Sequence, residues 1–255
     1  HKHRRRQRQM CIRDSIDNHP CSSFYHNTQW LLLTKKAFSH DSFTVIAFNA
    51  NGAIVGYLPL TEIRSGLFGH YGISLPFVNY GGPVADSSEI EIGLLEAAQK
   101  HCRSRTLQHL EIRHTKKLID WPVKSEKVSM ILRLPDDQTA LDRQLGSKVR
   151  AQIKQANAHS LDRRSGTIEL LDDFYQVFAT NMRDLGTPVY AKCFFRKILE
   201  TFPEKARIVI LLNNEKPVSA AFLMGHGEML EIPWASTLRS ANSMNANMYL
   251  YREVL

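Results

Sequence analysis

Two acidic side chains in the second half of the chain are placed where a proton acceptor could work. Asp184 follows Arg183 near the end of a predicted helix, and Glu231 lies in a predicted strand. A carboxylate beside an attacking amine can accept its proton, so Asp184 and Glu231 are candidate catalytic bases. A surface carboxylate paired with a neighbouring arginine is the competing interpretation of each.

Three basic residues upstream share one predicted helix. Lys148, Arg150 and Lys154 lie on it, and Val149 and Ile153 belong to its apolar side. Arginine offers paired donors to phosphate and lysine a compact charge, so these side chains could clamp a phosphate of a nucleotide-linked or tRNA substrate. A solvated helix face explains the same charges without a ligand, and both interpretations stay open.

Aromatic side chains occur near the same predicted helix end. Gly186 ends the helix and Pro188 forms a turn, which would project Arg183 and Tyr190 towards a neighbouring ligand. Tyr190 and Trp234 could stack on a sugar or a base, although large aromatic residues more often belong to a core.

Polar residues flank the last predicted helix. Asn242 and Asn247 stand on either side of its start, where helix capping accounts for one of them. Tyr251 lies one helical turn beyond Asn247 on the same face. We therefore include these three residues among the candidate substrate contacts.

Other kinds of site find little support in the sequence. Cys21, Cys102 and Cys193 are isolated, without C-x-x-C spacing, which fits a reducing, cytoplasmic setting, and we expect Cys193 to be a small buried side chain. The eleven histidines form no H-x-x-x-H pattern, so we predict no metal site.

Composition describes a globular chain of 255 residues, 43% of them hydrophobic. No apolar run approaches the roughly 20 residues that span a bilayer, so we predict no transmembrane segment. The formal net charge is +8, and residues 1–15 carry six basic side chains and one acidic one. We interpret this basic run as a non-native segment resembling translated adapter sequence, and the mild remaining charge argues against DNA binding.

Hydrophobic periodicity predicts an α+β chain that repeats one order of elements. The first half has a helix over 30–38, strands over 43–48 and 53–63 around an Asn-Gly turn, a strand running into a loop over 65–85, a helix over 86–103, and strands over 107–113 and 127–134. The second half has helices over 141–159, 171–185 and 192–202, strands over 207–212, 218–225 and 229–236, and a helix over 242–255.

We infer two domains, 16–138 and 139–255, each with a mixed sheet flanked by helices. The last predicted helix reaches Leu255 without a capping signal or further strands. We therefore expect the second domain to be truncated at its C-terminus.

Four longer motifs accompany these residues. They are Leu75-Pro-Phe-Val-Asn-Tyr-Gly-Gly-Pro83, Lys148-Val-Arg150 through Ile153-Lys154, Met182-Arg-Asp-Leu-Gly-Thr-Pro-Val-Tyr190, and Ile232-Pro-Trp-Ala-Ser236 followed by Asn247-Met-Tyr-Leu-Tyr251. With them the chain after Ser15 resembles the FemAB family, in particular its branch associated with the PEP-CTERM/exosortase A exopolysaccharide system.

The resemblance implies two GNAT-like (acyl-CoA N-acyltransferase) domains in tandem and transfer of an acyl or aminoacyl group to a cell-envelope precursor. Fem proteins take the aminoacyl group from charged tRNA and attach it to a peptidoglycan precursor. The acceptor site is expected in the cleft between domains near Asn79 and Tyr80, and Ser236 belongs to the implied substrate contacts. A cytoplasmic location follows, with peripheral attachment to the membrane left open.

The donor can be argued from the loop that usually holds coenzyme A. A GNAT loop of Arg/Gln-x-x-Gly-x-Gly/Ala type brings backbone N–H groups close to the pyrophosphate. Asn242 and Met244 occupy the small positions in the second half, and Pro83 removes a donor in the first. This favours aminoacyl-tRNA over acyl-CoA. An ordinary acetyl-CoA-dependent N-acetyltransferase and a non-catalytic module that binds an envelope glycan or nucleotide-linked precursor remain alternatives.

Overall fold

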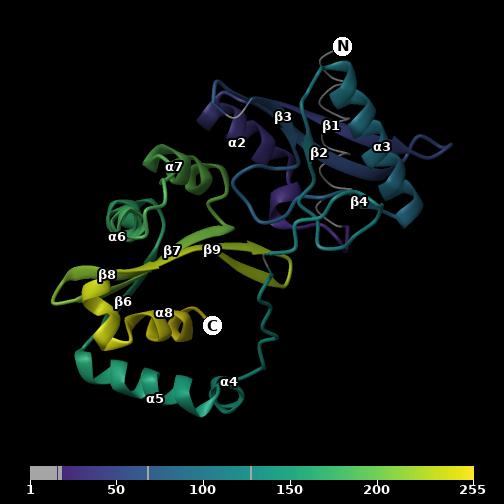
Figure 1. The fold of residues 1–255 in the computed structure, drawn as a ribbon. Helices are drawn as coiled ribbons and strands as arrows, with labels where there is room; N and C mark the ends of the chain where they lie inside the picture. The colour runs from purple at the N-terminus through teal and green to yellow at the C-terminus, as the bar shows by residue number, and fades with distance from the viewer. Residues whose placement is uncertain (1–15, 17–18, 68, 127) are drawn as a thin grey trace. The chain divides into compact units, whose positions relative to one another are not determined.

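A computed structural model describes residues 16, 19–67, 69–126 and 128–255 (Figure 1). The chain forms two compact units, unit 1 up to Lys124 and unit 2 from Ser125 to Leu255, each containing one β-sheet. The boundary between the units therefore lies earlier than the predicted boundary at 138/139. The predicted non-native segment, 1–15, lies outside the described residues.

The sheet of unit 1 is mixed. Its strands are β1 (Asp41–Phe48), β2 (Ile54–Ser65), β3 (Gly69–Ile73), β4 (Val84–Ala85) and β5 (Leu110–Glu111). The order is β1-β2-β3-β5, with β4 paired to β2, and only the β3–β5 pairing is parallel. The predicted hairpin between β1 and β2 is confirmed, since the Asn49 side chain accepts the backbone N–H groups of Asn51 and Ala53, both at 3.0 Å.

Helices of unit 1 are η1 (Phe24–His26), α2 (Thr28–Phe38) and α3 (Ser88–Ser104). The Ser87 hydroxyl caps α3 by accepting from the N–H of Ile90 at 3.3 Å. Leu94 and Ala98 of α3 are buried with Leu58 of β2, which fixes α3 on the sheet.

The sheet of unit 2 consists of β6 (Asp162–Gly166), β7 (Ala206–Asn213), β8 (Lys216–His226) and β9 (Met229–Thr237), in that order. Every described pairing in it is antiparallel. The expectation of a mixed sheet therefore holds only for unit 1. Tight hairpins join β7, β8 and β9, and such hairpins connect antiparallel strands.

Helices cover both faces of the second sheet, as Figure 1 shows. On one side lie α6 (Leu171–Asp184) and α7 (Lys192–Thr201), and on the other α5 (Ser147–Ala156) and α8 (Ala246–Val254). Alternate residues of the strands point to opposite faces of this sheet. Phe222 of β8 packs with α6 and α7, whereas its neighbour Ala221 packs in the cluster shared with α8.

Some predicted elements differ from the structure. Residues 128–134 form no strand and expose apolar side chains such as Met130 and Ile131. A segment with strand propensity forms a strand only when another strand pairs with it. The predicted helix 141–159 is divided into α4 (Gln138–Gln144), α5 and η2 (Asn157–His159). The strand predicted over 107–113 shrinks to β5.

The remaining short helices are η3 (Ile168–Leu170) before α6 and η4 (Arg239–Met244) before α8. The predicted helix 242–255 is thus divided between η4 and α8, with Asn245 in the left-handed region at φ +52° between them. Among the described residues no helix is long and apolar enough to cross a bilayer.

Candidate functional site

Polar contacts join the end of α6 to the end of β9. Asn181 Nδ2 donates to Ser236 Oγ at 3.2 Å, and Arg239 Nη2 donates to the backbone carbonyl of Asp184 at 2.6 Å. Ser236 is buried, and Ser219 of β8 donates to its carbonyl at 3.3 Å. The predicted site residues Asp184 and Ser236 are therefore brought to the same end of unit 2.

The Asp184 carboxylate remains accessible at this place. Its side chain is 25% exposed and lies 3.3 Å from the guanidinium of Arg183, whose own side chain is 76% exposed. An ion pair between exposed neighbours in sequence contributes little to stability. The carboxylate can therefore exchange this partner for another group, as a proton acceptor must.

Aromatic rings lie close to the contacts between α6 and β9. Tyr190 and Trp234 meet edge to face with centroids 6.2 Å apart, and Trp234 also packs on Phe195 at 5.1 Å. Trp234 is 9% exposed, so most of the indole belongs to the core between β9 and α7. The Tyr190 backbone is held by Tyr175, whose hydroxyl donates to its carbonyl at 3.1 Å.

Glu231, the second candidate base, lies near the start of β9, opposite Met224 of β8. Ser236 and Arg239 lie at the other end of that strand. A strand rises about 3.3 Å per residue, which puts about 16 Å of strand between Glu231 and Ser236. Asp184 and Glu231 therefore cannot both act on one proton at the β9 end.

The residues around the last helix lie on the other face of the sheet. Asn242 is exposed in η4, Asn247 is half-buried in the first turn of α8, and Tyr251 is 38% exposed one turn later. No side chain caps the N-terminus of α8 within the described residues. Ala246, the first residue of α8, is itself buried.

The basic residues of α5 have unequal surroundings. Arg150 Nη1 donates to the carbonyls of Asp142 at 3.3 Å and Arg143 at 3.4 Å and also to that of Leu145, so it caps the C-terminus of α4. Lys148 and Lys154 are exposed and make no hydrogen bond or ion pair with any described residue. Arg150 thus has a structural role that the charge pattern alone does not indicate.

Unit 1 contains a distorted loop at the predicted acceptor motif. Leu75 and Phe77 adopt φ values of +49° and +73°, which side chains other than glycine rarely adopt. Arg113 holds the loop by donating to the Val78 carbonyl at 2.6 Å. Asn79 at its tip is exposed. A loop held in an unusual shape with an exposed polar tip suits ligand binding.

Two histidines contact the same loop at Gly82. His26 Nε2 and the Gly82 carbonyl are 2.9 Å apart, and a Cβ on Gly82 would lie 2.3 Å from His114 Nδ1. Tyr80 of the motif packs edge to face on Tyr25 at 5.9 Å. Burial lowers the pKa of His114, and the charge of Lys116 acts in the same direction against that of Glu91. His114 is thus held as a neutral imidazole at physiological pH.

Four site residues were not anticipated from the sequence: Asn181, Arg239, Arg113 and His114. Asn181 directly precedes the Met182 motif, and Arg239 follows the Ser236 motif, so proximity to motifs was the available signal. The contacts of Arg113 and His114 depend on the parallel pairing of β3 with β5, which local patterns do not reveal.

The described cysteines differ in their exposure. Cys193 is exposed in the first turn of α7, so the expectation that it is buried is wrong, whereas Cys102 of α3 is buried. Among the described residues, no group of three His, Cys, Asp or Glu side chains is placed to hold a metal ion.

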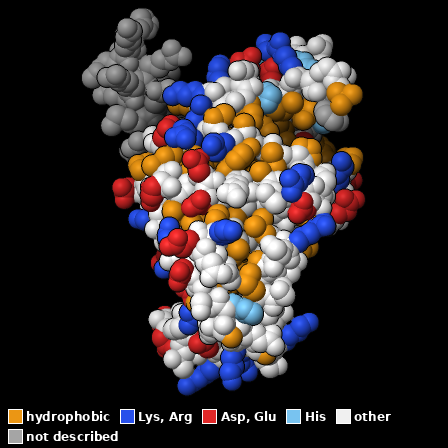
Figure 2. Space-filling model, turned by 90° about the vertical axis from the view of Figure 1, so that its left-hand side faces the viewer, with side chains coloured by type: hydrophobic (Ala, Val, Ile, Leu, Met, Phe, Trp, Pro, Cys, Tyr) orange, Lys and Arg blue, Asp and Glu red, His pale blue; other side chains and the backbone are white. Residues whose placement is uncertain are grey.

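On the described part of the face in Figure 2, acidic and basic side chains are interspersed.

Comparison with protein families finds a match to the acetyltransferase (GNAT) domain over residues 147–255. No curated protein sequence matches the chain. The structure is similar to that of FemX, with a TM-score of 0.67 and 12% identity over 96% of this chain and 83% of FemX.

Two further solved structures are similar at lower scores. A conserved protein of unknown function from Bacteroides thetaiotaomicron has a TM-score of 0.50 and 12% identity over 96% of this chain and 84% of its own. The C-terminal domain of an Agrobacterium fabrum protein, described as a putative lysylphosphatidylglycerol synthetase, has a TM-score of 0.50 and 12% identity over 83% of this chain and 65% of its own. The chain therefore has an α+β, GNAT-like fold with two sheets flanked by helices, and residues 147–255 match the acetyltransferase (GNAT) domain.

Proposed function

We propose that the chain is a FemAB-type transferase that moves an aminoacyl or acyl group onto an amine or hydroxyl of a cell-envelope precursor. The observation that carries this proposal is the similarity to FemX, which extends over 96% of the chain and therefore includes both units. The motifs that resemble the exosortase-associated branch favour a precursor of peptidoglycan or exopolysaccharide. We expect the chain to act in the cytoplasm, where a nucleotide-linked precursor and charged tRNA are both present.

The proposed chemistry needs positioning and one proton transfer. The acceptor amine attacks the carbonyl carbon of the donor, the bond from that carbon to the leaving oxygen or sulfur breaks, and the amine loses a proton. Asp184 is the group that we propose accepts this proton, because its carboxylate is accessible while Arg239 holds its backbone. Asn181 and Ser236 position the surrounding backbone.

Substrate contacts are proposed on both units. The loop with Asn79 and Tyr80 would hold the acceptor, since its shape is fixed by Arg113. Asn242, Asn247 and the uncapped start of α8 would face the phosphates of the donor. The exposed side chains of Lys148 and Lys154 on α5 and of Tyr251 on α8 would extend this contact along a nucleic-acid backbone, since α5 and α8 lie on the same side of the sheet of unit 2 (Figure 1).

A second candidate function is acetyl transfer from acetyl-CoA. The match of residues 147–255 to the acetyltransferase (GNAT) domain favours it. The absence of small residues at Asn242 and Met244 argues for the aminoacyl donor. The two functions differ in the group that reaches the acceptor.

A transfer assay distinguishes these functions. The full chain is incubated with a nucleotide-linked muramyl-pentapeptide and either total tRNA charged with labelled amino acids or labelled acetyl-CoA. We expect label from charged tRNA in the precursor. Label only from acetyl-CoA would establish the second candidate, and binding of the precursor with no transfer from either donor would indicate a non-catalytic module.

A further inference from the structure

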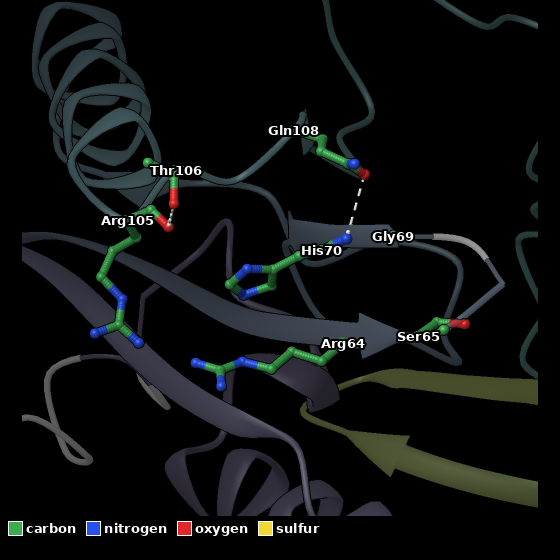
Figure 3. A pocket seen from close by; sticks show the side chains of 8 residues that line it. Arg64, Ser65, Gly69, His70, Arg105, Thr106 and Gln108 are labelled. Carbon is green, nitrogen blue, oxygen red and sulfur yellow. Dashed lines mark hydrogen bonds between the residues drawn. The ribbon is translucent and has the colours of Figure 1, made fainter.

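A hollow in unit 1 is built from basic and polar side chains of three segments (Figure 3). It has a volume of about 730 Å³, is open to solvent, and lies where β2 turns into β3 and where α3 leads to β5. The side chains that matter for its chemistry are Arg64, His70, Arg105, Thr106 and Gln108. All of them belong to unit 1.

A buried carboxylate organises the basic groups of this hollow. Glu62 of β2 is 4% exposed, and Arg105 grips it as a fork, with Nε–Oε1 and Nη2–Oε2 distances of 3.1 Å. His70 Nε2 lies 3.3 Å from Oε2, and Arg64 Nη2 lies 3.7 Å from the same oxygen. One carboxylate thus gathers three basic side chains.

The charges in this cluster do not cancel. Burial alone would raise the pKa of Glu62, but hydrogen bonds from Arg105 and His70, together with their charges, outweigh it and hold the pKa below its usual range. Glu62 therefore carries a full negative charge at neutral pH. Arg64 and Arg105 carry two positive charges, which leaves a net charge of +1 before any contribution from His70.

Donor groups in the hollow remain exposed. The Arg64 side chain is 63% exposed and donates no hydrogen bond to a described residue, and that of Arg105 is 46% exposed. Asp41 adds its charge to the surroundings of Arg105 but is paired with Lys35 at 3.2 Å. Arg64 and Arg105 therefore share the single carboxylate of Glu62, and the described cluster keeps a surplus positive charge.

The walls of the hollow are held in unusual backbone conformations. Thr106, a β-branched residue, has φ +54°, and Gly69 has φ +83°. A Cβ on Gly69 would lie 1.9 Å from the Gln108 side-chain oxygen, which accepts from the N–H of His70 at 3.2 Å (Figure 3). The left-handed conformation costs free energy at Thr106, and strained backbone is concentrated at functional sites. If the role of the basic side chains were only to neutralise the charge of Glu62, Arg105 alone would be enough.

We propose that this hollow binds a phosphate group, with Arg64 and Arg105 as charged donors and His70 and Thr106 as neighbouring polar groups. Arginine suits phosphate because its planar fork gives two parallel donors to tetrahedral oxygens. Glu62 holds the Arg105 side chain in place before the ligand arrives. The site concerns binding alone and does not depend on the proposed transfer reaction.

Calorimetric titration of the full chain with sodium phosphate at constant ionic strength tests the site. Arg64→Gln removes one donor and leaves the Glu62–Arg105 fork intact. Arg103→Gln is the matched control, because Arg103 is exposed in the last turn of α3 but does not line the hollow. We expect Arg64→Gln to weaken phosphate binding about tenfold, and Arg103→Gln to change it less than about twofold.

Two further probes identify the source of the phosphate. Tighter binding of ADP than of inorganic phosphate, lost in Arg64→Gln, assigns the site to a soluble phosphorylated molecule. Binding of phosphatidylglycerol vesicles but not phosphatidylcholine vesicles, again lost in Arg64→Gln, assigns it to a lipid headgroup. The proposal is overturned if none of these probes binds, or if Arg64→Gln and Arg103→Gln weaken binding equally.

Discussion

Asp184 combines a fixed backbone with an accessible carboxylate. Arg239 holds its carbonyl at 2.6 Å, and the carboxylate is 25% exposed beside Arg183. A group in this state can meet a substrate without unfolding the end of α6. Of the two candidate catalytic bases, Asp184 lies near the contacts with Ser236 and Arg239, whereas Glu231 lies at the other end of β9.

The Asp184→Asn variant tests this assignment. It keeps the shape and removes the proton acceptor, so we expect the transfer rate to fall about 100-fold with little change in donor binding. Asp173→Asn removes a carboxylate from the first turn of the same helix and should retain nearly full activity. Equal activities of the two variants would exclude Asp184 as the base.

His114 predicts a pH-dependent stability. Burial lowers its pKa from the ordinary value of 6.5, so the unfolded chain binds its proton more readily than the folded chain does. The stabilisation is therefore fully present above pH 6.5 and is lost as the pH falls from there towards the lowered pKa. Urea unfolding at a series of pH values through this range should show the decline.

A variant without this titration serves as the reference. His114→Gln should flatten the decline, whereas His159→Gln, at an exposed position, should leave it unchanged. The folded state carries a second histidine with a lowered pKa, His40, so part of the slope should remain. An unchanged slope in His114→Gln would contradict the neutral state of the buried imidazole.

Candidate residues could be found from the sequence, but their grouping could not. Asp184 and Ser236 were both candidates and do lie at one end of unit 2. Trp234 was weighed as a stacking shelf and is 9% exposed, because alternation along β9 directs it into the aromatic core. Tyr251 belongs to α8, which lies on the opposite face of the sheet from α6 with Asp184, and only the three-dimensional structure separates them (Figure 1).

At the scale of elements, the end of α3 offers a direct test of strain. The N–H of Leu107 bonds to the carbonyl of Cys102 at 3.0 Å, and Thr106 occupies the left-handed position of this helix ending. Glycine is the usual residue there. Thr106→Gly should therefore remove the cost of the left-handed conformation, while glycine gives the unfolded chain more freedom. The net result should be a stabilisation of about 0.5–1 kcal/mol, measured by urea unfolding.

Ser104→Gly, inside the last turn of α3, is the matched control for this change. It should destabilise the chain by about 0.5–1 kcal/mol, because glycine is unfavourable within a helix. Destabilisation by Thr106→Gly of the same size would show that the left-handed conformation carries no strain. The pair of variants thus separates strain from the general effect of glycine.

Arg150 tests whether the charges on α5 serve the fold. Truncation by Arg150→Ala removes the donor that caps α4, so we expect a loss of about 1 kcal/mol of unfolding free energy. Lys154→Ala on the same helix should change it by less than about 0.5 kcal/mol, since Lys154 contacts no described partner. Equal effects would mean that Arg150 is solvated like Lys154.

Most helices and strands could be predicted because their formation depends on residues that are close in the sequence. The Asn-Gly hairpin and the amphipathic pattern of α6 and α7 depend on neighbours in sequence, and both are confirmed. β6 was missed because Asp162–Gly166 is polar and becomes a strand only by pairing with β7. Residues 128–134 have the composition of a strand but find no partner strand among the described residues.

For the whole molecule, the sequence indicated two related halves, and the structure contains two sheets in two compact units. The similarity to FemX covers both of them. The halves differ in strand pairing, since only the first sheet includes a parallel pair. We propose that unit 2 binds the donor, since the acetyltransferase (GNAT) match lies within it.

We propose that this chain takes its donor from charged tRNA. The most direct measurement is the melting temperature of the full chain with charged tRNA and, separately, with acetyl-CoA, against uncharged tRNA as control. A ligand that binds only the folded state raises the melting temperature, and we predict such a rise with charged tRNA that exceeds the effect of uncharged tRNA. A rise with acetyl-CoA and none with charged tRNA would contradict the account and identify the chain as an acetyl-CoA-dependent enzyme.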